Sequence, residues 1–148
     1  MPAFTIRPFA PPDFDAWYPL WRGYQSFYKV DLPLETSRVT WQRFLDPGEP
    51  MYGVFALDEE RPVGIVHYIR HRSCWTVGDY CYLQDLFVDE SVRGRGAGRV
   101  LIEHVYAKAK AMGCSRVHWL TQETNHEAMQ LYDRIADRSG FVQYRKVF

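Results

Sequence analysis

Residues 82–88 read YLQDLFV, and after four further residues the chain continues as RGRGAG at 93–98. The first stretch is rich in aromatic and branched residues and predicts a β-strand. The second has three glycines at alternate positions and opens an amphipathic helical pattern over 97–112. Glycines let a backbone approach a ligand closely, and a helix N-terminus presents unpaired N–H groups and a positive dipole end. The stretch therefore predicts a strand, a loop and a helix that hold a phosphate-bearing ligand.

Two familiar phosphate-binding loops do not fit these residues. A P-loop needs Lys followed by Ser or Thr after its last glycine, and here Arg and Val at 99–100 follow Gly98. A dinucleotide-binding fingerprint that starts at Gly94 and Gly96 needs Gly or Ala at position 99 and an acidic residue near position 114. Neither is present, since 113–115 read GCS. Dinucleotide binding is therefore disfavoured.

The pattern Arg-x-x-Gly-x-Gly does fit, and it resembles the pyrophosphate loop of the GNAT superfamily of acetyl-CoA-dependent N-acetyltransferases. A second block of that family is matched downstream, in the right order, by Asn125, Ala128, Leu131, Tyr132, Gly140 and Phe141. The resemblance spans roughly residues 82–141. Within the family, 82–88 and 123–126 are most similar to the polyamine acetyltransferases and to the yeast histone and polyamine acetyltransferase group.

Length and composition limit the class of protein. The chain has 148 residues, 47% of them hydrophobic and 16% aromatic, which suits one well-packed domain. We expect a single N-acetyltransferase domain over 1–148. No segment approaches the roughly 20 apolar residues of a membrane span, and 1–5 lack the basic start and apolar core of a signal peptide. We therefore expect a cytoplasmic protein with no membrane partner.

Neither the net charge nor the cysteines and histidines predict a further ligand. Eighteen basic residues balance eighteen acidic ones, so we expect no nucleic-acid partner, although Arg93, Arg95 and Arg99 form a local basic cluster. The three cysteines form no Cys-x-x-Cys pair, and their odd number suits reduced thiols. His67 and His71 share a face of an expected strand, but no third ligand is evident, so no metal is expected.

The order of elements predicts a mixed sheet. Strands are expected at 4–7, 51–57, 63–70, 81–88, 116–121 and 141–147, and helices after Asp13 and at 34–45, 97–112 and 125–137. The strand–helix–strand unit at 81–121 makes its two strands parallel. The fold class is α/β (α+β). The resemblance implies a GNAT-like, mostly antiparallel sheet of six to seven strands with a parallel central pair and helices on both faces.

The resemblance implies acetyl-CoA as the cofactor. Backbone groups of Leu86, Phe87 and Val88 are expected to pair with the pantetheine arm like an added strand. The pyrophosphate is expected on the loop formed by Arg93, Gly94, Arg95, Gly96, Ala97, Gly98 and Arg99. The arginine side chains serve the nucleotide phosphates or form a solvated cluster. Asn125 is similar to the residue that meets the pantetheine amides, and a helix N-cap is the other role open to it.

Tyr132 matches the family tyrosine that assists the departing coenzyme A thiolate. With unperturbed pKa values of about 10 for Tyr and about 8.5 for a thiol, full proton transfer is uphill by roughly 2 kcal/mol, so a hydrogen bond is an adequate role. The other reading is a core tyrosine that packs with Ala128 and Leu131.

The general base is where the sequence departs from its relatives. An amine of pKa about 10.4 must lose a proton before it attacks a thioester, at a penalty near 4.6 kcal/mol at pH 7. Polyamine acetyltransferases have a glutamate at the position of Gln84, other relatives have one at Tyr82, and neither residue here can be a base. Strand alternation puts Asp85 on the face opposite Tyr82 and Gln84. Asp85 and Glu123 remain candidates, as do a water relay and a substrate amine of low pKa.

The expected function is N-acetyl transfer by direct attack of a primary amine on acetyl-CoA. A polyamine or other small amine is favoured as acceptor, with an amino acid or a protein lysine next. The alternatives are a non-catalytic acyl-CoA-binding module and, less favoured, a nucleic-acid-binding module. The aromatic residues at 17–28 are expected mostly in the core, with some able to line the acceptor pocket. The apolar strand at 140–148 suggests a homodimer.

Overall fold

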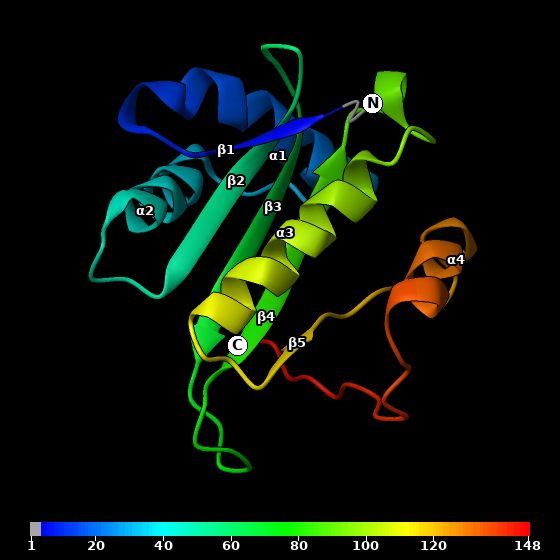
Figure 1. The fold of residues 1–148 in the computed structure, drawn as a ribbon. Helices are drawn as coiled ribbons and strands as arrows, with labels where there is room; N and C mark the ends of the chain where they lie inside the picture. The colour runs from blue at the N-terminus through cyan, green and yellow to red at the C-terminus, as the bar shows by residue number, and fades with distance from the viewer. Residues whose placement is uncertain (1–3) are drawn as a thin grey trace.

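The structure, a computed structural model, describes residues 4–148 (Figure 1). The strands are β1 (Thr5–Pro8), β2 (Met51–Asp58), β3 (Arg61–His71), β4 (Tyr80–Val88) and β5 (Arg116–His118). The α-helices are α1 (Phe14–Phe27), α2 (Leu34–Leu45), α3 (Ala97–Ala111) and α4 (His126–Ile135), with short 3-10 turns at Pro11–Asp13 and Glu90–Val92.

One sheet holds these strands in the order β1-β2-β3-β4-β5. Neighbours are antiparallel except β4 and β5, which are parallel, so the mixed and mostly antiparallel sheet is confirmed. The predicted number of strands is wrong, because residues 4–148 form five, and the parallel pair lies at an edge of this sheet. Residues 141–147 form no strand: they are exposed, and they pair with none of the strands in the described part of the chain.

Local signals predicted several elements well. Helix α2 has the predicted bounds, and β2 and β3 form the predicted hairpin with Glu59 at the turn in a left-handed conformation, φ 59°. Asp13 stands at the N-cap position of α1, but its carboxylate accepts from the backbone N–H of Ala10 at 2.9 Å instead of capping α1. Strand β5 is half its predicted length.

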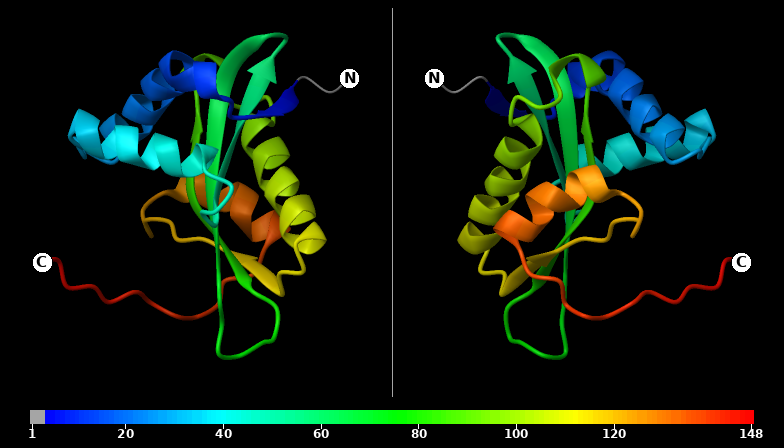
Figure 2. Two further views of the ribbon diagram at one scale, coloured as in Figure 1. Left: turned by 90° about the vertical axis from the view of Figure 1, so that its left-hand side faces the viewer. Right: turned by 90° about the vertical axis from the view of Figure 1, so that its right-hand side faces the viewer.

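Helices cover both faces of the sheet, as predicted. Helices α1 and α2 lie on one face and α3 on the other (Figure 2), each over its own apolar core. Helix α4 packs beside α3, where the Tyr106 hydroxyl donates to the carbonyl of Ile135 at 2.9 Å. None of the helices of residues 4–148 is both long and apolar enough to cross a bilayer.

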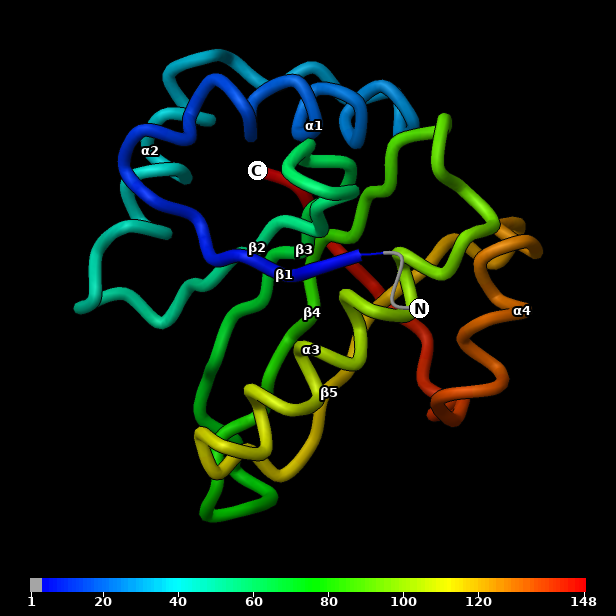
Figure 3. The backbone as a smooth tube through the Cα atoms, turned by 45° about the horizontal axis from the view of Figure 1, so that its top comes forward, coloured from blue at the N-terminus to red at the C-terminus, as the bar shows by residue number. Residues whose placement is uncertain are grey.

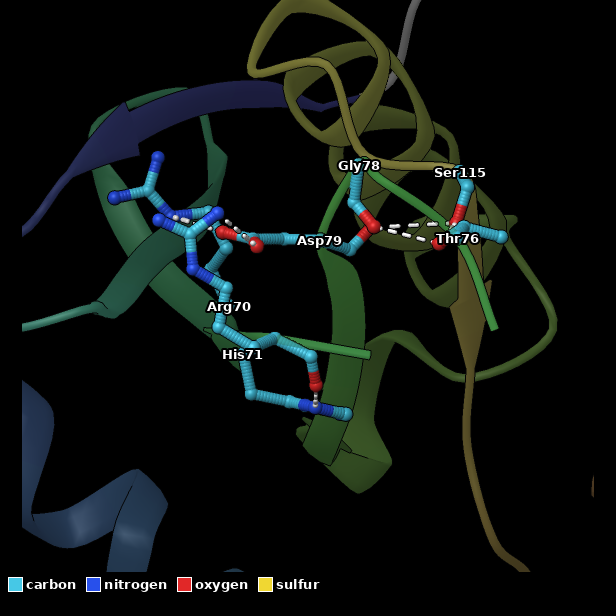
Figure 4. A network of polar contacts seen from close by, with 7 residues as sticks. Arg70, His71, Thr76, Gly78, Asp79 and Ser115 are labelled. Carbon is cyan, nitrogen blue, oxygen red and sulfur yellow. Dashed lines mark hydrogen bonds and ion pairs between the residues drawn. The ribbon is translucent and has the colours of Figure 1, made fainter. Parts of the chain in front are cut away.

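A polar network fastens the start of β5 to the hairpin between β3 and β4 (Figure 4). The carboxylate of Asp79 accepts from Arg72 and forms an ion pair with Arg70, and its carbonyl accepts from the N–H of Ser115 at 2.8 Å. The hydroxyls of Thr76 and Ser115 are 2.9 Å apart. Pairing with β4 then covers only Tyr80–Tyr82, so the later residues of β4 have no strand partner on that side within the described chain.

Candidate active site

A β-bulge in β4 decides which side chains face the site. Tyr68 of β3 lies opposite Leu83, but the preceding His67 lies opposite Asp85, so Gln84 is the extra residue. Leu83 and Leu86 consequently pack in the same core under α3, although unbroken alternation would put them on opposite faces. The prediction that Asp85 faces away from Tyr82 is therefore wrong, because the bulge shifts the alternation by one residue.

Asp85 is a buried carboxylate, 8% exposed, and it hydrogen-bonds to a buried histidine of β3. Its Oδ2 lies 2.9 Å from Nδ1 of His67, and Nε2 of His67 accepts from Nε1 of Trp17 at 3.0 Å. Gln84 is exposed, and Glu123 is exposed in the loop before α4. Of the carboxylates considered from the sequence, Asp85 alone is both buried and hydrogen-bonded, which favours it over Glu123.

Three tyrosines surround this carboxylate. Burial raises the pKa of Tyr24, Tyr28 and Tyr82, and the negative charge of Asp85 raises each pKa further. All three hydroxyls therefore keep their protons at neutral pH. Tyr24 and Tyr28 come from α1 and the residue after it, whereas Tyr82 comes from β4. The result is an anionic centre in an aromatic and hydroxyl-lined setting, which suits an ammonium group.

Tyr132 of α4 belongs to the same neighbourhood. Burial, with a smaller contribution from Tyr28, raises the pKa of Tyr132 to about 12. Its ring meets Trp119 edge-on, with centroids 5.3 Å apart. Asp85 raises the pKa of Tyr28, and Tyr28 raises that of Tyr132, so Tyr28 lies near both of these predicted site residues.

The glycine loop leads into α3 as predicted. Gly94 and Gly96 have positive φ of 82° and 89°, and Gly96 stands at the N-cap position, where no side chain caps the helix. The first N–H groups of α3, from Ala97 onward, therefore have no side-chain partner at the cap and point out of the helix end. This end of α3 is suited to an anion.

Gly98 differs from the other two loop glycines. Its φ is not in the left-handed region, and a methyl group there would make only ordinary contacts, 3.9 Å from Leu131 Cδ2 and 4.0 Å from Val88 Cγ2. In the tube view the loop and α4 lie on the same side of the molecule, away from α2 (Figure 3). Nothing in residues 4–148 requires glycine at 98, whereas a ligand that approaches the backbone closely would.

The loop arginines have partners within the protein. Arg93 Nε donates to the carbonyl of Val88 at 3.1 Å, Arg95 pairs with Asp58 at 3.1 Å and Arg99 pairs with Glu103 at 2.7 Å. Arg95 and Arg99 are each about half exposed, so these are surface pairs of small energy. Contact with the nucleotide phosphates and a solvated cluster both stay open to these arginines.

The other predicted cofactor contacts fall into two groups. Leu86 and Phe87 lie on the part of β4 that β5 leaves unpaired, whereas the Val88 carbonyl already accepts from Arg93. Asn125 stands at the N-cap position of α4, but its side chain makes no capping bond, so it is open to another partner.

Sequence reasoning considered His67 only as a metal ligand and missed its contact with Asp85, and it did not single out Tyr24 and Tyr28 among the aromatic residues at 17–28. A signal for His67 existed, because a histidine in the apolar run 63–69 needs a buried hydrogen-bond partner. Within residues 4–148, no three His, Cys, Asp or Glu side chains gather where one metal ion could contact them.

Comparisons with known proteins agree with this geometry. The profile of the family described as "Acetyltransferase (GNAT) family" matches residues 14–136. A D-amino-acid N-acetyltransferase of Saccharomyces cerevisiae is 38% identical over 144 residues, covering 96% of this chain and 89% of the yeast protein. An L-ornithine N5-acetyltransferase of Arabidopsis thaliana is 27% identical over 84% of this chain and 50% of its own length. A solved structure of AAC(6')-Iy with a CoA bisubstrate analogue has the same fold, with a TM-score of 0.84 at 16% identity, covering 98% of both chains.

Proposed function

Because this chain belongs to the acetyltransferase (GNAT) family and is an acetyl-transferring enzyme, we propose that it moves the acetyl group of acetyl-CoA onto the amino group of a small amino-acid-like acceptor. The observation that carries the proposal is the buried carboxylate of Asp85 among Tyr24, Tyr28 and Tyr82. A carboxylate in such a setting can bind an ammonium group and then take its proton.

The residues of the loop fit acetyl-CoA. Gly98 is explained by close backbone approach, the uncapped N-terminus of α3 offers N–H groups to the pyrophosphate, and the unpaired edge of β4 at Leu86 and Phe87 offers backbone groups to the pantetheine amides. The carbonyl of Val88 would have to lose its hydrogen bond from Arg93 Nε before it could also contact the pantetheine arm. Acetyl-CoA itself supplies a carbonyl carbon activated as a thioester.

Arg95 and Arg99 are proposed to reach the nucleotide phosphates by exchanging surface partners. Each now pairs with a carboxylate, Asp58 or Glu103, in a half-exposed position. A phosphate is a strong acceptor for guanidinium, and a surface ion pair contributes little to stability, so the exchange of partners costs little free energy. Asn125, whose side chain is uncapped, is proposed to meet a pantetheine amide.

Asp85 is the proposed general base. The acceptor amine enters as an ammonium ion, and deprotonating it at pH 7 costs about 4.6 kcal/mol when its pKa is about 10.4. A carboxylate in contact with the ammonium group takes that proton directly or through water as the nitrogen attacks. Gln84 cannot do this, and as the exposed bulge residue its proposed role is to direct Asp85 into the site.

Tyr132 is the proposed hydrogen-bond donor to the departing thiolate. With its pKa at about 12 and a thiol pKa of about 8.5, complete proton transfer would be uphill by about 5 kcal/mol. A neutral phenol that donates without giving up its proton stabilises the thiolate at lower cost.

The substrate class follows from the acceptor groups of the relatives. The yeast relative carries a D-amino-acid activity in its name and the Arabidopsis relative an L-ornithine activity. Both acceptors are amino acids, so an amino acid is proposed ahead of the polyamine that the sequence favoured. A matching screen would measure thiol release from acetyl-CoA with D- and L-amino acids, ornithine, a polyamine and a lysine peptide. Transfer to none of these amines would overturn the proposal.

We also propose that the chain forms a single domain and that the protein is a homodimer. Beyond α4, the backbone of the C-terminal segment runs out on the side of α1 and α2 (Figure 2). Phe141, Tyr144 and Phe148 of this segment are exposed, and the Phe141 ring lies 6.4 Å from that of Trp75, centroid to centroid. A second copy is proposed to cover this apolar segment. Sedimentation equilibrium tests it, and a monomer at all concentrations would contradict it.

A further inference from the structure

Two consecutive hydrogen bonds join α1 to Asp85 through β3. Trp17 Nε1 donates to His67 Nε2 at 3.0 Å, and His67 Nδ1 lies 2.9 Å from Asp85 Oδ2. Trp17 is fully buried and His67 is 2% exposed. With water excluded, the two ring nitrogens of His67 depend on these two partners.

Trp17 fixes which nitrogen of His67 carries the proton. An indole N–H can only donate, so Nε2 of His67 must be the acceptor and carries no hydrogen. The proton of the imidazole is then on Nδ1, from which it is donated to Asp85. A proton on Nε2 would place two N–H groups against each other.

Aromatic rings fix the orientation of this imidazole. The His67 ring lies 4.5 Å from the ring of Phe44 and 5.0 Å from that of Trp21, centroid to centroid. Phe9 meets it edge-on at 5.9 Å. These rings come from α1, α2 and the segment after β1, so the direction of the Nδ1–H bond is set by packing on several sides.

We infer that Trp17 and His67 are positioning residues of the amine site. They hold Asp85 by Oδ2, with the proton of His67 kept on Nδ1, so that the carboxylate meets the acceptor ammonium group in one orientation. The inference rests on the proposed role of Asp85 and deepens it. A base held in one orientation reacts faster than one free to rotate, and a misplacement of about 1 Å lowers the rate by up to about 100-fold.

Two substitutions of His67 separate positioning from packing. The amide nitrogen of His67→Asn takes a place close to Nδ1 and can still donate to Asp85. His67→Gln reaches the place of Nε2 and can accept from Trp17, but it leaves Asp85 without its donor. We expect kcat to fall about 10- to 100-fold in His67→Gln and much less in His67→Asn, with KM for acetyl-CoA unchanged in both. Equal losses in the two variants would overturn the inference.

A substitution of Trp17 has a matched control on the same helix. Trp17→Phe keeps a ring and removes the N–H that fixes His67. Trp21→Phe likewise keeps an aromatic ring beside His67, but the buried indole N–H that it removes binds Ser37 Oγ, at 3.1 Å, and not His67. We expect comparable losses of thermal stability, but a lower kcat only in Trp17→Phe.

Nitrogen-15 NMR of the histidine rings tests the tautomer without any activity measurement. The His67 signals are those that His67→Asn removes. In the unmodified protein and in Trp21→Phe they should report a proton on Nδ1 alone. In Trp17→Phe no indole N–H keeps a proton off Nε2, while Asp85 still accepts from Nδ1, so the signals should report protons on both nitrogens. A proton on Nε2 in the unmodified protein, or no change in Trp17→Phe, would overturn the inference. If no amine were acetylated, the proposed function would fail while these spectra still decided the tautomer.

Discussion

Asp85 lies directly opposite His67 across β3 and β4, one step away from the pairing that an unbroken ladder would give. The ladder that pairs Tyr68 with Leu83 would otherwise bring Gln84 to His67, and Asp85 would face the core under α3. The single extra residue therefore exchanges a neutral amide for a carboxylate at the centre of the site.

Replacing Asp85 with Asn should abolish most of the activity. The amide keeps the size of the carboxylate but cannot take a proton, so kcat should fall by about 10²- to 10⁴-fold at pH 7. Steady-state kinetics measure this, with acetyl-CoA affinity by calorimetry as the control for an intact cofactor site. Gln84→Ala should lose far less, and a loss as large as that of Asp85→Asn would move the base to another group.

Gly98→Ala should separate stability from cofactor binding. Alanine fits the helix and its surroundings, so the free energy of unfolding should stay the same or rise by up to about 1 kcal/mol. Affinity for acetyl-CoA should nevertheless fall, since the methyl group occupies the approach of the pyrophosphate. Urea unfolding and calorimetry measure the two quantities. Unchanged affinity would mean that the phosphates lie elsewhere.

Gly96→Ala is the matched comparison. At φ 89° an alanine is strained, and about 1–2 kcal/mol of stability should be lost without any crowding. A stability equal to that of the unmodified protein would show that the loop relaxes easily to a different conformation.

Tyr132→Phe should lower kcat more than it changes the KM for acetyl-CoA. It removes one hydrogen bond to a charge that develops late in the reaction, which typically lowers kcat by about 10²- to 10³-fold. Because the pKa of Tyr132 is about 12, the unmodified enzyme should show no loss of rate from this phenol below about pH 11. Wild-type rates in Tyr132→Phe would assign it to the core alone.

Stability should fall at high pH. Burial raises the pKa of Tyr68 and of Tyr132 to about 12, above the value of about 10 in an unfolded chain. The folded state therefore holds these protons more tightly, and the stabilisation present below pH 10 is lost as the pH rises through 12. Urea unfolding between pH 8 and 11.5 should show a smaller decline in Tyr68→Phe, and the same decline in both proteins would exclude Tyr68 as a cause.

The loop at 93–98 was predicted from the sequence because its requirements are local. The motif Arg-x-x-Gly-x-Gly lies within a few consecutive residues, and with the downstream block it led to the family that the comparisons confirm. The positive φ of Gly96 and the uncapped helix start depend on the same short stretch. The same holds for α2 and for the hairpin of β2 and β3, whose periodicity and turn residues lie within each element. The finer resemblance to polyamine or histone acetyltransferases stays a prediction.

The sequence by itself thus determined the family, the parallel strand pair and the positions of Tyr132 and the glycine loop. Only the tertiary structure decided the face of Asp85, the partners of His67 and the absence of a strand at 141–147 in the described chain. Each of these depends on a backbone or side chain distant in sequence: the register of β3 against β4, the indole of Trp17 fifty residues from His67, and a neighbouring strand for the C-terminal segment. Strand alternation is a local rule, and a bulge breaks it because ladder pairing and core packing are satisfied between strands rather than within one.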